Sequence, residues 1–295
     1  MTSAEMTAKL AAGQGFIAAL DQSGGSTPKA LAGYGVAEGN WSNDDEMYGL
    51  IHAMRSRIIR SPAFTGDKVV GAILFVRTMD GQVDGVATPQ ALIDKDIVPF
   101  IKVDLGLEPE ENGVQMMRPV PGLDALLERA KALGVFGTKE RSVINSANEA
   151  GIAVLVAQQF QMARQVLAKG MMPIIEPEVN INSADRDTSE RFLLAALGAE
   201  LDHLPEEQQV MLKVSIPVKP NLYAPLVLHP RVARVVALSG GFSRNEACIE
   251  LAKNRGMIAS FSRALLSDLR ADMSEDQFDT ALGKAIDQIC AASAG

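Results

Sequence analysis

Val69-Val-Gly-Ala-Ile-Leu-Phe75 has no polar side chain on either of the two faces that a β-strand would present. A strand with two apolar faces is typical of a parallel sheet covered by helices on both sides, because neither face then meets water. Similar short apolar runs recur along the chain, separated by stretches with a helical pattern. The eight runs are 15–21, 69–75, 99–104, 135–141, 172–178, 210–215, 234–241 and 257–263.

Eight strand and helix units in series limit the fold to two architectures. Because crossovers between parallel strands are right-handed, such units form either a barrel or a doubly wound open sheet. The number of units favours an α/β fold of the (β/α)8 (TIM) barrel type, whose usual size is close to the 295 residues of this chain. No linker or low-complexity tract divides the sequence. We therefore expect one TIM-barrel domain over residues 1–295.

The expected helices follow the strands, and two of them begin with clear capping signals. Ser42 and Asn43 precede Asp44 and Asp45, and Ser274 precedes Glu275 and Asp276, so each helix starts with a capping side chain and acids in its first turn. The helical patterns cover residues 44–60, 89–95, 122–133, 143–169, 186–203, 221–229, 243–255 and 264–292.

Charge and composition exclude several classes of function. The formal net charge of −8 disfavours binding to nucleic acid or to anionic membranes, so an anionic substrate would need a local cluster of cations. No window approaches the roughly 18 continuous apolar residues of a membrane span. Residues 1–10 include Glu5 and Lys9 and lack the apolar core of a signal peptide. We therefore expect a cytoplasmic protein with a small-molecule substrate; a homo-oligomer is compatible with the sequence.

Cysteine and histidine are too sparse to predict a metal centre. Cys248 and Cys290 lie in helical patterns without CxxC spacing, which argues against a disulfide framework and against a zinc site. His52, His203 and His229 all fall outside the strand ends, whereas a catalytic metal usually draws two or three histidines into one site. We predict no metal and no cofactor.

The carboxyl ends of the eight strands would meet at one mouth, where barrel enzymes build their active sites. Lys213 lies inside Val210-Met-Leu-Lys-Val-Ser215, where burial penalises the ammonium and favours a neutral, nucleophilic amine. The alternative is a lysine at a strand edge whose charged end reaches outward to water. This run alone does not decide between them.

Two carboxylates end the fifth run, in Ile174-Ile-Glu-Pro-Glu178. Glu176 and Glu178 share one strand face, and their mutual repulsion would favour a proton on one of them, which could then act as an acid or base. Acids at the start of a loop are also common as solvated residues or helix caps. The buried lead-in favours the first interpretation.

Cations on the third and fourth strands predict an anion site. Lys139 and Arg141 are two residues apart and therefore share one strand face, and Lys102 shares a face with Asp104 in the same way. Such cations suit a phosphorylated or bisanionic substrate. Internal ion pairing, such as Lys102 with Glu178, is an alternative that could coexist with it.

Glycine pairs follow the first and seventh strands, in Asp21-Gln-Ser-Gly-Gly-Ser26 and in Leu238-Ser-Gly-Gly-Phe-Ser243. They allow backbone N–H groups to approach an anion at the start of a helix, although tight turns use glycine for steric reasons too. Loops after the last strands of such barrels often hold a phosphate, and Arg263, in Ser260-Phe-Ser-Arg263, is the expected cationic partner.

Six of these motifs, in this order, resemble the class I (Schiff-base) fructose-1,6-bisphosphate aldolases, and in particular their shorter bacterial branch. The resemblance covers almost the whole chain. The motifs are Ala-Ala-Leu-Asp-Gln-Ser-Gly-Gly-Ser (18–26), Ile-Lys-Val-Asp (101–104), Phe-Gly-Thr-Lys-Glu-Arg (136–141), Pro-Ile-Ile-Glu-Pro-Glu (173–178), Leu-Ser-Gly-Gly (238–241) and Ser-Phe-Ser-Arg-Ala-Leu (260–265).

The resemblance implies a metal-independent, reversible cleavage of fructose 1,6-bisphosphate into dihydroxyacetone phosphate and glyceraldehyde 3-phosphate through a lysine imine. Lys213 would form the imine, Glu176 would be the acid and base of carbinolamine dehydration, and Lys139 would polarise that step. Glu178 would be a supporting carboxylate, and Asp21 would take the hydroxyl proton as the carbon–carbon bond breaks. The residues implied in substrate and phosphate binding are Ser23, Ser26, Lys102, Arg141, Ser239, Gly240, Gly241, Ser260 and Arg263.

Several features depart from the longer animal and plant form of the family, among them the lysine context and residue 22. That form has its imine lysine in a Leu-Lys-Pro-Asn context, which Lys219-Pro-Asn221 imitates, but Lys213 is favoured because it lies within the apolar strand. Gln22 stands where the longer form has glutamate. The alternatives are a related imine-forming enzyme, such as a tagatose bisphosphate aldolase or a transaldolase-like enzyme, and a non-catalytic phosphosugar-binding barrel.

Overall fold

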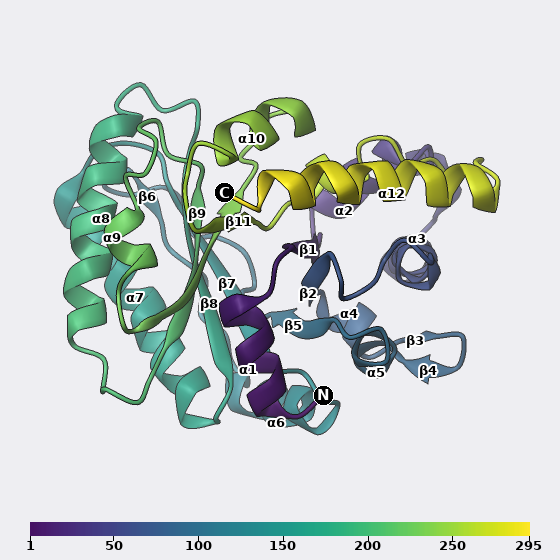
Figure 1. The fold of residues 1–295 in the computed structure, drawn as a ribbon, viewed down its shortest axis with the longest axis horizontal. Helices are drawn as coiled ribbons and strands as arrows, with labels where there is room; N and C mark the ends of the chain where they lie inside the picture. Colours follow the sequence, from purple (N-terminus) through teal and green to yellow (C-terminus); the bar gives the residue numbers. More distant parts are fainter.

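Eight parallel strands form the centre of the molecule in the computed structural model, which describes all 295 residues (Figure 1). Each strand overlaps one of the expected runs and pairs with its neighbours in chain order. Ala19 N–H donates to the carbonyl of Phe261 at 3.1 Å, so the last strand returns to the first and the barrel is nearly closed. The (β/α)8 prediction is confirmed. The strands are β1 (Phe16–Leu20), β2 (Val69–Leu74), β5 (Val98–Lys102), β7 (Gly137–Ile144), β8 (Met172–Val179), β9 (Val210–Ser215), β10 (Val232–Leu238) and β11 (Met257–Ala259).

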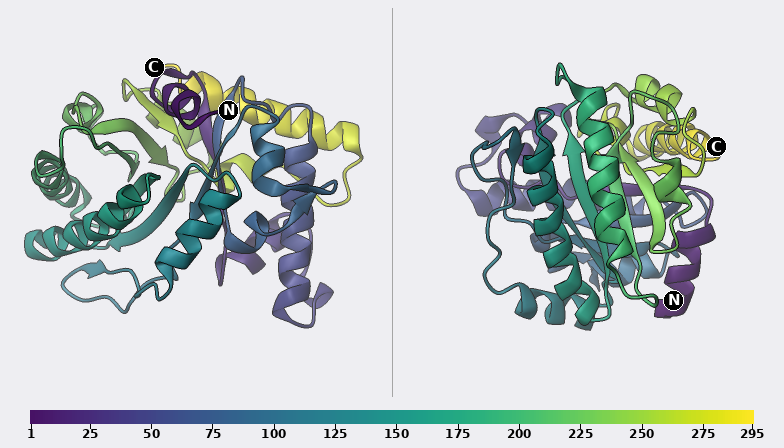
Figure 2. Two further views of the ribbon diagram at one scale, coloured as in Figure 1. Left: turned by 90° about the horizontal axis from the view of Figure 1, so that it is seen from below. Right: turned by 90° about the vertical axis from the view of Figure 1, so that its left-hand side faces the viewer.

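Helices cover the outside of the strands, and Figure 2 shows α7 and α8 packed side by side there. The two capping predictions are confirmed: Asn43 accepts from Glu46 N–H at 3.0 Å, and Ser274 accepts from Gln277 N–H at 3.3 Å. None of the helices is long and apolar enough to cross a membrane. The helices between strands are α2 (Ser26–Gly33), α3 (Asp44–Arg60), α4 (Val76–Met79), α5 (Thr88–Ile93), α6 (Leu123–Ala132), α7 (Glu149–Ala168), α8 (Arg186–Asp202), α9 (Ala224–Val227) and α10 (Arg244–Leu251); α11 (Arg263–Leu266) and α12 (Glu275–Ala292) follow the last strand.

Two of the helical patterns differ most from the observed boundaries. The pattern over 143–169 begins too early, because β7 continues to Ile144 and the side chain of Asn148 caps the helix by accepting from Gly151 N–H. The pattern over 264–292 is two helices, α11 and α12. Arg57 holds the segment between them by donating to backbone carbonyls, including that of Met273 at 2.6 Å.

Several short elements had no clear signal in the sequence. They are the helices α1 (Ser3–Ala12) and α2, a 3-10 turn (Glu38–Asn40), the hairpin of β3 (Gln82–Val83) with β4 (Val86–Ala87), and β6 (Val114–Gln115), which pairs with β7 in the antiparallel sense.

Helix α1 closes the amino-terminal end of the barrel. Met6 and Leu10 join the apolar cluster inside the strands, and Arg234 of β10 donates to the carbonyls of Leu10 at 2.9 Å and Gly13 at 2.6 Å. A larger apolar cluster fills the space between strands and helices. With one end plugged by packed side chains, only the carboxyl ends of the strands remain open for a site.

A buried carboxyl group lies on β7, between Lys139 and Arg141 in sequence but on the alternate face of the strand. Glu140 has no exposed surface, and neither of its carboxyl oxygens has a hydrogen-bond partner. Burial, followed by the negative charge of Asp104, raises the pKa of Glu140 well above its ordinary value of 4.5. The charged form is therefore disfavoured in the folded protein.

Replacing this group by its neutral isostere is expected to change how stability depends on pH. Because the pKa of Glu140 is raised in the folded protein, its protonated form contributes to the free energy of unfolding. This contribution is fully present at low pH and is lost as pH rises above the ordinary carboxyl value. Glu140→Gln has no proton to lose and should gain about 1–3 kcal/mol over wild type between pH 5 and pH 8. Thermal unfolding across this range measures the difference, with Glu149→Gln on the surface as control. A difference that does not vary with pH would contradict this expectation.

Candidate active site

The side chains on the inner face of the barrel change from apolar to polar between one inward-facing residue of a strand and the next. Residues two apart on a strand share a face, so each of these polar side chains points into the barrel directly above an apolar one. The apolar residue and the polar residue that follows it are Phe100 and Lys102 on β5, Ile174 and Glu176 on β8, Met211 and Lys213 on β9, and Ile258 and Ser260 after β11.

A cavity of about 650 Å³ opens above this layer, at the carboxyl ends of the strands. All of the fourteen site residues inferred from the sequence line it except Gly241. The thirteen are Asp21, Ser23, Ser26, Lys102, Lys139, Arg141, Glu176, Glu178, Lys213, Ser239, Gly240, Ser260 and Arg263. Residues from seven different strand ends thus converge on one cavity.

Lys139 is the centre of the buried charges at the base of the cavity. Its Nζ lies 2.8 Å from Asp21 Oδ2, 2.9 Å from Glu176 Oε2 and 3.7 Å from Asp104 Oδ2, and its side chain is only 2% exposed. Burial alone would lower the pKa of Lys139, but Asp21, Glu176 and Asp104 raise it well above its usual range. Lys139 is therefore a fixed cation rather than a nucleophile.

Asp21 is held ionised by the same contacts. Burial alone would raise the pKa of Asp21, but the charges of Lys139, Lys213 and Lys102 outweigh burial and bring it well below its usual range. An ionised carboxylate so placed can accept a proton from a substrate hydroxyl only when the substrate brings that hydroxyl into contact with it.

Glu176 connects the two buried lysines. Its Oε1 lies 3.0 Å from Lys213 Nζ, while its Oε2 faces Lys139 in an ion pair that lacks hydrogen-bond alignment. Lys213 and Glu176 are each 3% exposed. An amine in direct contact with a carboxylate, at the base of a polar cavity, has the geometry needed for a nucleophile and its acid or base.

The remaining charges pair differently from the expected arrangement. Lys102 contacts Asp104, with Nζ and Oδ1 2.6 Å apart, and not Glu178. Glu178 instead accepts from Arg141 Nε at 2.5 Å. Glu176 and Glu178 therefore each have their own cationic partners, which offsets the repulsion that the sequence led us to expect. Glu178 pairs with Arg141 and not with Lys102 because β8, which carries Glu178, lies next to β7 and not next to β5.

The turn after β10 is held in a conformation that suits glycine. Gly240 has a φ of +60°, and a Cβ atom there would lie 2.6 Å from Ile181 Cγ2. Gly241, at φ +119°, belongs to the same turn although it does not line the cavity. Ser239 is buried beside them. The close approach of Ile181 explains glycine at position 240, and the positive φ explains glycine at position 241.

Two cations on the cavity wall have no acidic partner. Arg263 follows β11 and Lys29 lies in α2, after β1, and both side chains are exposed. In the adjoining turn, Ser26 Oγ accepts from Ser23 N–H at 2.9 Å and donates to the Ser23 carbonyl at 2.8 Å, which shapes the entrance to α2. Free cations beside such turns suit an anionic group of a ligand.

Comparison with known families agrees with this geometry. A family model described as fructose-bisphosphate aldolase class-I matches residues 3–226. The chain belongs to this family. The match supports an aldolase, a lyase acting on a phosphosugar; membership of the shorter bacterial branch stays a prediction.

Two solved structures resemble the fold of this aldolase family member. A fructose-bisphosphate aldolase from Plasmodium falciparum, in complex with TRAP and a small-molecule inhibitor, is 19% identical with a TM-score of 0.78, covering 99% of this chain and 94% of that chain. Cgl0159 from Corynebacterium glutamicum is 12% identical with a TM-score of 0.56, covering 98% and 92%. At these identities the likeness concerns the fold.

Lys219, the alternative candidate for an imine-forming lysine, lies outside the cavity. Its side chain is 61% exposed and its Nζ lies 3.4 Å from Asp187 Oδ1. It follows β9 in the segment before α9, whereas Lys213 points into the barrel. A substrate in the cavity could contact Lys213 but not Lys219.

Sequence reasoning missed several residues that line the aldolase cavity. Asp104 was noted for sharing a face with Lys102 but was not included in the site, although the same alternation predicts its direction. Lys29 could have been found from its position in the first turns of a helix that follows the Asp21–Ser26 turn. The others are Gln22, Gly25, Ala30, Gly106, Leu238 and Ser262.

Proposed function

We propose that this chain reversibly cleaves fructose 1,6-bisphosphate into dihydroxyacetone phosphate and glyceraldehyde 3-phosphate through an imine on Lys213, within a single domain of residues 1–295. The proposal is carried by one observation: Lys213 Nζ lies 3.0 Å from a Glu176 carboxylate that also contacts Lys139, at the base of a cavity with cations on its wall.

In the proposed reaction, the neutral amine of Lys213 attacks the keto carbon and forms a carbinolamine. Glu176 carries a proton from the nitrogen to the oxygen during addition; it then takes up a proton from solvent and transfers it to the departing hydroxyl, so that water leaves as the protonated imine forms. Lys139 stabilises the carboxylate of Glu176 before it takes up the proton and after it has given the proton away. The protonated imine is then an electron-poor centre directly beside the carbon–carbon bond that must break.

Cleavage follows from that electron demand. Asp21 takes the proton of the hydroxyl on the far side of the bond, and the electron pair of the carbon–carbon bond moves into the imine, giving an enamine and releasing glyceraldehyde 3-phosphate. Protonation of the enamine and hydrolysis of the imine release dihydroxyacetone phosphate and restore the lysine.

The phosphate groups of the substrate would bind to the rim. Ser239, Gly240 and Arg263 are proposed to hold one phosphate, and Ser23, Ser26 and Lys102 the other, with Arg141 nearby. Arg263 is the member without an acidic partner and is the most available for a direct ion pair. The two proposed sites lie on different strand ends of one cavity, as a bisphosphate requires.

Chemical trapping tests the imine directly. Incubation with dihydroxyacetone phosphate and sodium borohydride should reduce the imine to a stable secondary amine, which peptide mass analysis should place on Lys213. An adduct on Lys219 would move the imine to that residue, and no adduct on either lysine would contradict the proposal. Steady-state rates with fructose and tagatose bisphosphates then distinguish the preferred substrate from its epimer.

A further inference from the structure

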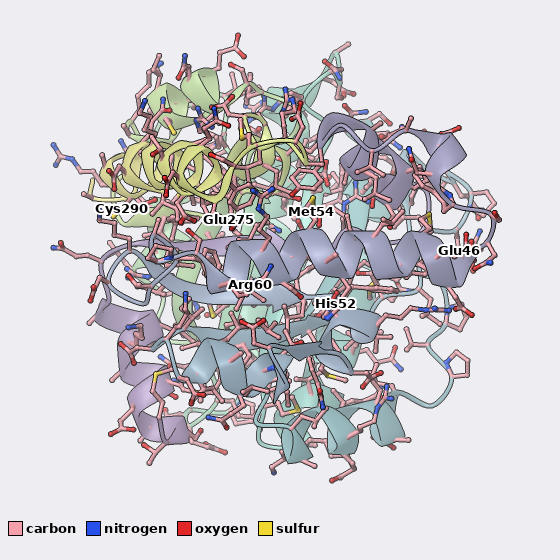
Figure 3. All side chains as sticks on the ribbon, turned by 90° about the vertical axis from the view of Figure 1, so that its right-hand side faces the viewer. Glu46, His52, Met54, Arg60, Glu275 and Cys290 are labelled. Carbon is pink, nitrogen blue, oxygen red and sulfur yellow. The ribbon has the colours of Figure 1, made fainter.

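A fully buried arginine lies behind the active site on α3. Figure 3 shows α3 along its length, from Glu46 near one end to Arg60 near the other, on the outside of the molecule beside α12. Arg55 follows the labelled Met54 and has no exposed surface, although arginine is almost never fully buried without a paired charge. It forms no ion pair, so its burial needs another explanation.

The guanidinium of Arg55 contacts the segments after two neighbouring strands and is linked through Gln22 to a third. It donates to the Gln22 carbonyl at 2.5 Å and to Gln22 Oε1 at 3.1 Å, both after β1, and to Thr78 Oγ1 at 2.7 Å, after β2. Gln22 Nε2 in turn donates to Ser262 Oγ at 2.6 Å, after β11. These contacts hold the segments that carry Asp21 on one side and Arg263 on the other.

The charge of Arg55 is coupled to the buried cluster through the nearby carboxylate of Asp21. Burial lowers the pKa of Arg55 to about 10, while Asp21 and then Tyr48 act in the opposite direction, so it remains a cation at neutral pH. With Arg55, the cluster has four cations against three carboxylates. When Lys213 loses its proton, three of each remain. The cations are Arg55, Lys102, Lys139 and Lys213, and the carboxylates are Asp21, Asp104 and Glu176.

Removing the charge of Arg55 would leave two cations against three carboxylates whenever Lys213 is neutral. Excess negative charge in a buried cluster favours the protonated form of each titratable group. Lys213 would therefore keep its ammonium proton as a counterion to the carboxylates. Charged groups from every neighbouring strand end face the same cavity as Lys213. They are Asp21, Lys29, Lys102, Asp104, Lys139, Arg141, Glu176, Glu178 and Arg263.

We propose that Arg55 is a positioning residue of the aldolase reaction, which anchors the Asp21–Gln22 segment and supplies the positive charge that allows Lys213 to become a neutral amine. The inference rests on the proposed imine function. The inference also gives a role to the segment that follows β2, for which the sequence indicated none. Thr78, in this segment, accepts a hydrogen bond from the guanidinium of Arg55.

Two substitutions at this position separate charge from geometry. Arg55→Met should shift the acid limb of the kcat/KM pH profile upward by on the order of one pH unit, with most of the activity recovered at high pH. Arg55→Lys keeps the charge and should leave the limb in place, but it cannot make the forked contact, so KM should rise by about threefold to tenfold. Arg57→Met, on the same helix but facing α12, is the matched control and should leave the limb unchanged.

The same series, followed by borohydride trapping across pH, keeps the two proposals distinguishable. If wild type traps an imine and Arg55→Met has the wild-type acid limb, the role of Arg55 is overturned while the imine stands. Equal shifts in Arg55→Met and Arg55→Lys would also overturn it, because the charge would then not be the cause. If wild type traps no imine at any pH, both proposals fail.

Should Arg55→Met not fold, Arg55→Lys and Gln22→Met decide the question. Both keep the buried cation while disturbing its contacts, so both should raise KM without moving the acid limb. A shifted limb in either variant, with circular dichroism showing an intact fold, would overturn the inference.

Discussion

Lys213→Met is expected to lower kcat by about 10⁴- to 10⁶-fold and to abolish borohydride trapping, because Lys139, the neighbouring lysine at the base of the cavity, is held as a cation and cannot act as the nucleophile. Methionine fills a similar volume without a charge, and the buried site should tolerate it. Steady-state rates and trapping with dihydroxyacetone phosphate measure the two effects. Binding of inorganic phosphate should survive, because the residues proposed to bind phosphate lie on other strand ends.

Lys219→Met is the matched control for this substitution. Lys219 is 61% exposed and forms one surface ion pair with Asp187, and such pairs contribute little to stability. Its activity should stay within about twofold of wild type. Substantial activity in Lys213→Met, or loss of activity in Lys219→Met, would contradict the assignment of the imine to the buried lysine. A binding protein without turnover predicts that neither substitution matters, since wild type would then be inactive.

Lys139→Met is expected to reduce both stability and activity. It removes the cation that Asp21, Glu176 and Asp104 share, and breaking a buried ion-pair cluster at one partner costs about 3–5 kcal/mol. The activity loss should be about 10²- to 10⁴-fold, because Glu176 would lose its partner during carbinolamine dehydration. Chemical denaturation and steady-state kinetics measure these two quantities.

The stability deficit of Lys139→Met should depend on pH in a defined direction. In wild type the pKa of Asp21 lies below its ordinary value of 3.8, so the stabilisation from its ionised form is present above that value and is lost as pH falls through the folded pKa. In the variant, the buried carboxylates can take up protons instead. The deficit should therefore be largest near neutral pH and shrink toward about pH 4. Lys169→Met, a surface variant, should show no such trend, and a deficit that is constant with pH would argue against the shared-cation model.

Much of the site could be predicted because strand geometry is local. Once 210–215 was interpreted as a buried strand, its period of two placed Lys213 on one face together with Met211, and the same rule applied to Glu176 and Lys102. The turn at Ser239–Gly241 was equally local, although only Ile181, from a different strand end, explains why a side chain at position 240 would not fit. Capping at Asn43 and Ser274 was local too, and was predicted correctly.

The pairing of charges could not be predicted in this way. Lys102 could pair with Asp104, two residues further on, or with Glu178, and only the folded barrel brings Lys102 Nζ to 2.6 Å from Asp104 Oδ1 and Glu178 into contact with Arg141. The boundary at Ile144 was missed for a similar reason: β6 pairs with Val143 and Ile144 at the end of β7, where the expected helix began. Arg55 gave no signal, because one arginine in an amphipathic helix with many polar residues looks like any solvated side chain.

The sequence by itself determined the strand and helix order, the inward direction of the polar side chains, and the motifs that place the chain in its family. These depend on a period of two along each strand and on short turns, which neighbouring residues specify. The tertiary structure alone decided which charges share a partner and why Arg55 is buried. Such pairings join residues far apart in the chain, and their energies depend on distance and burial, which exist only once the barrel has formed.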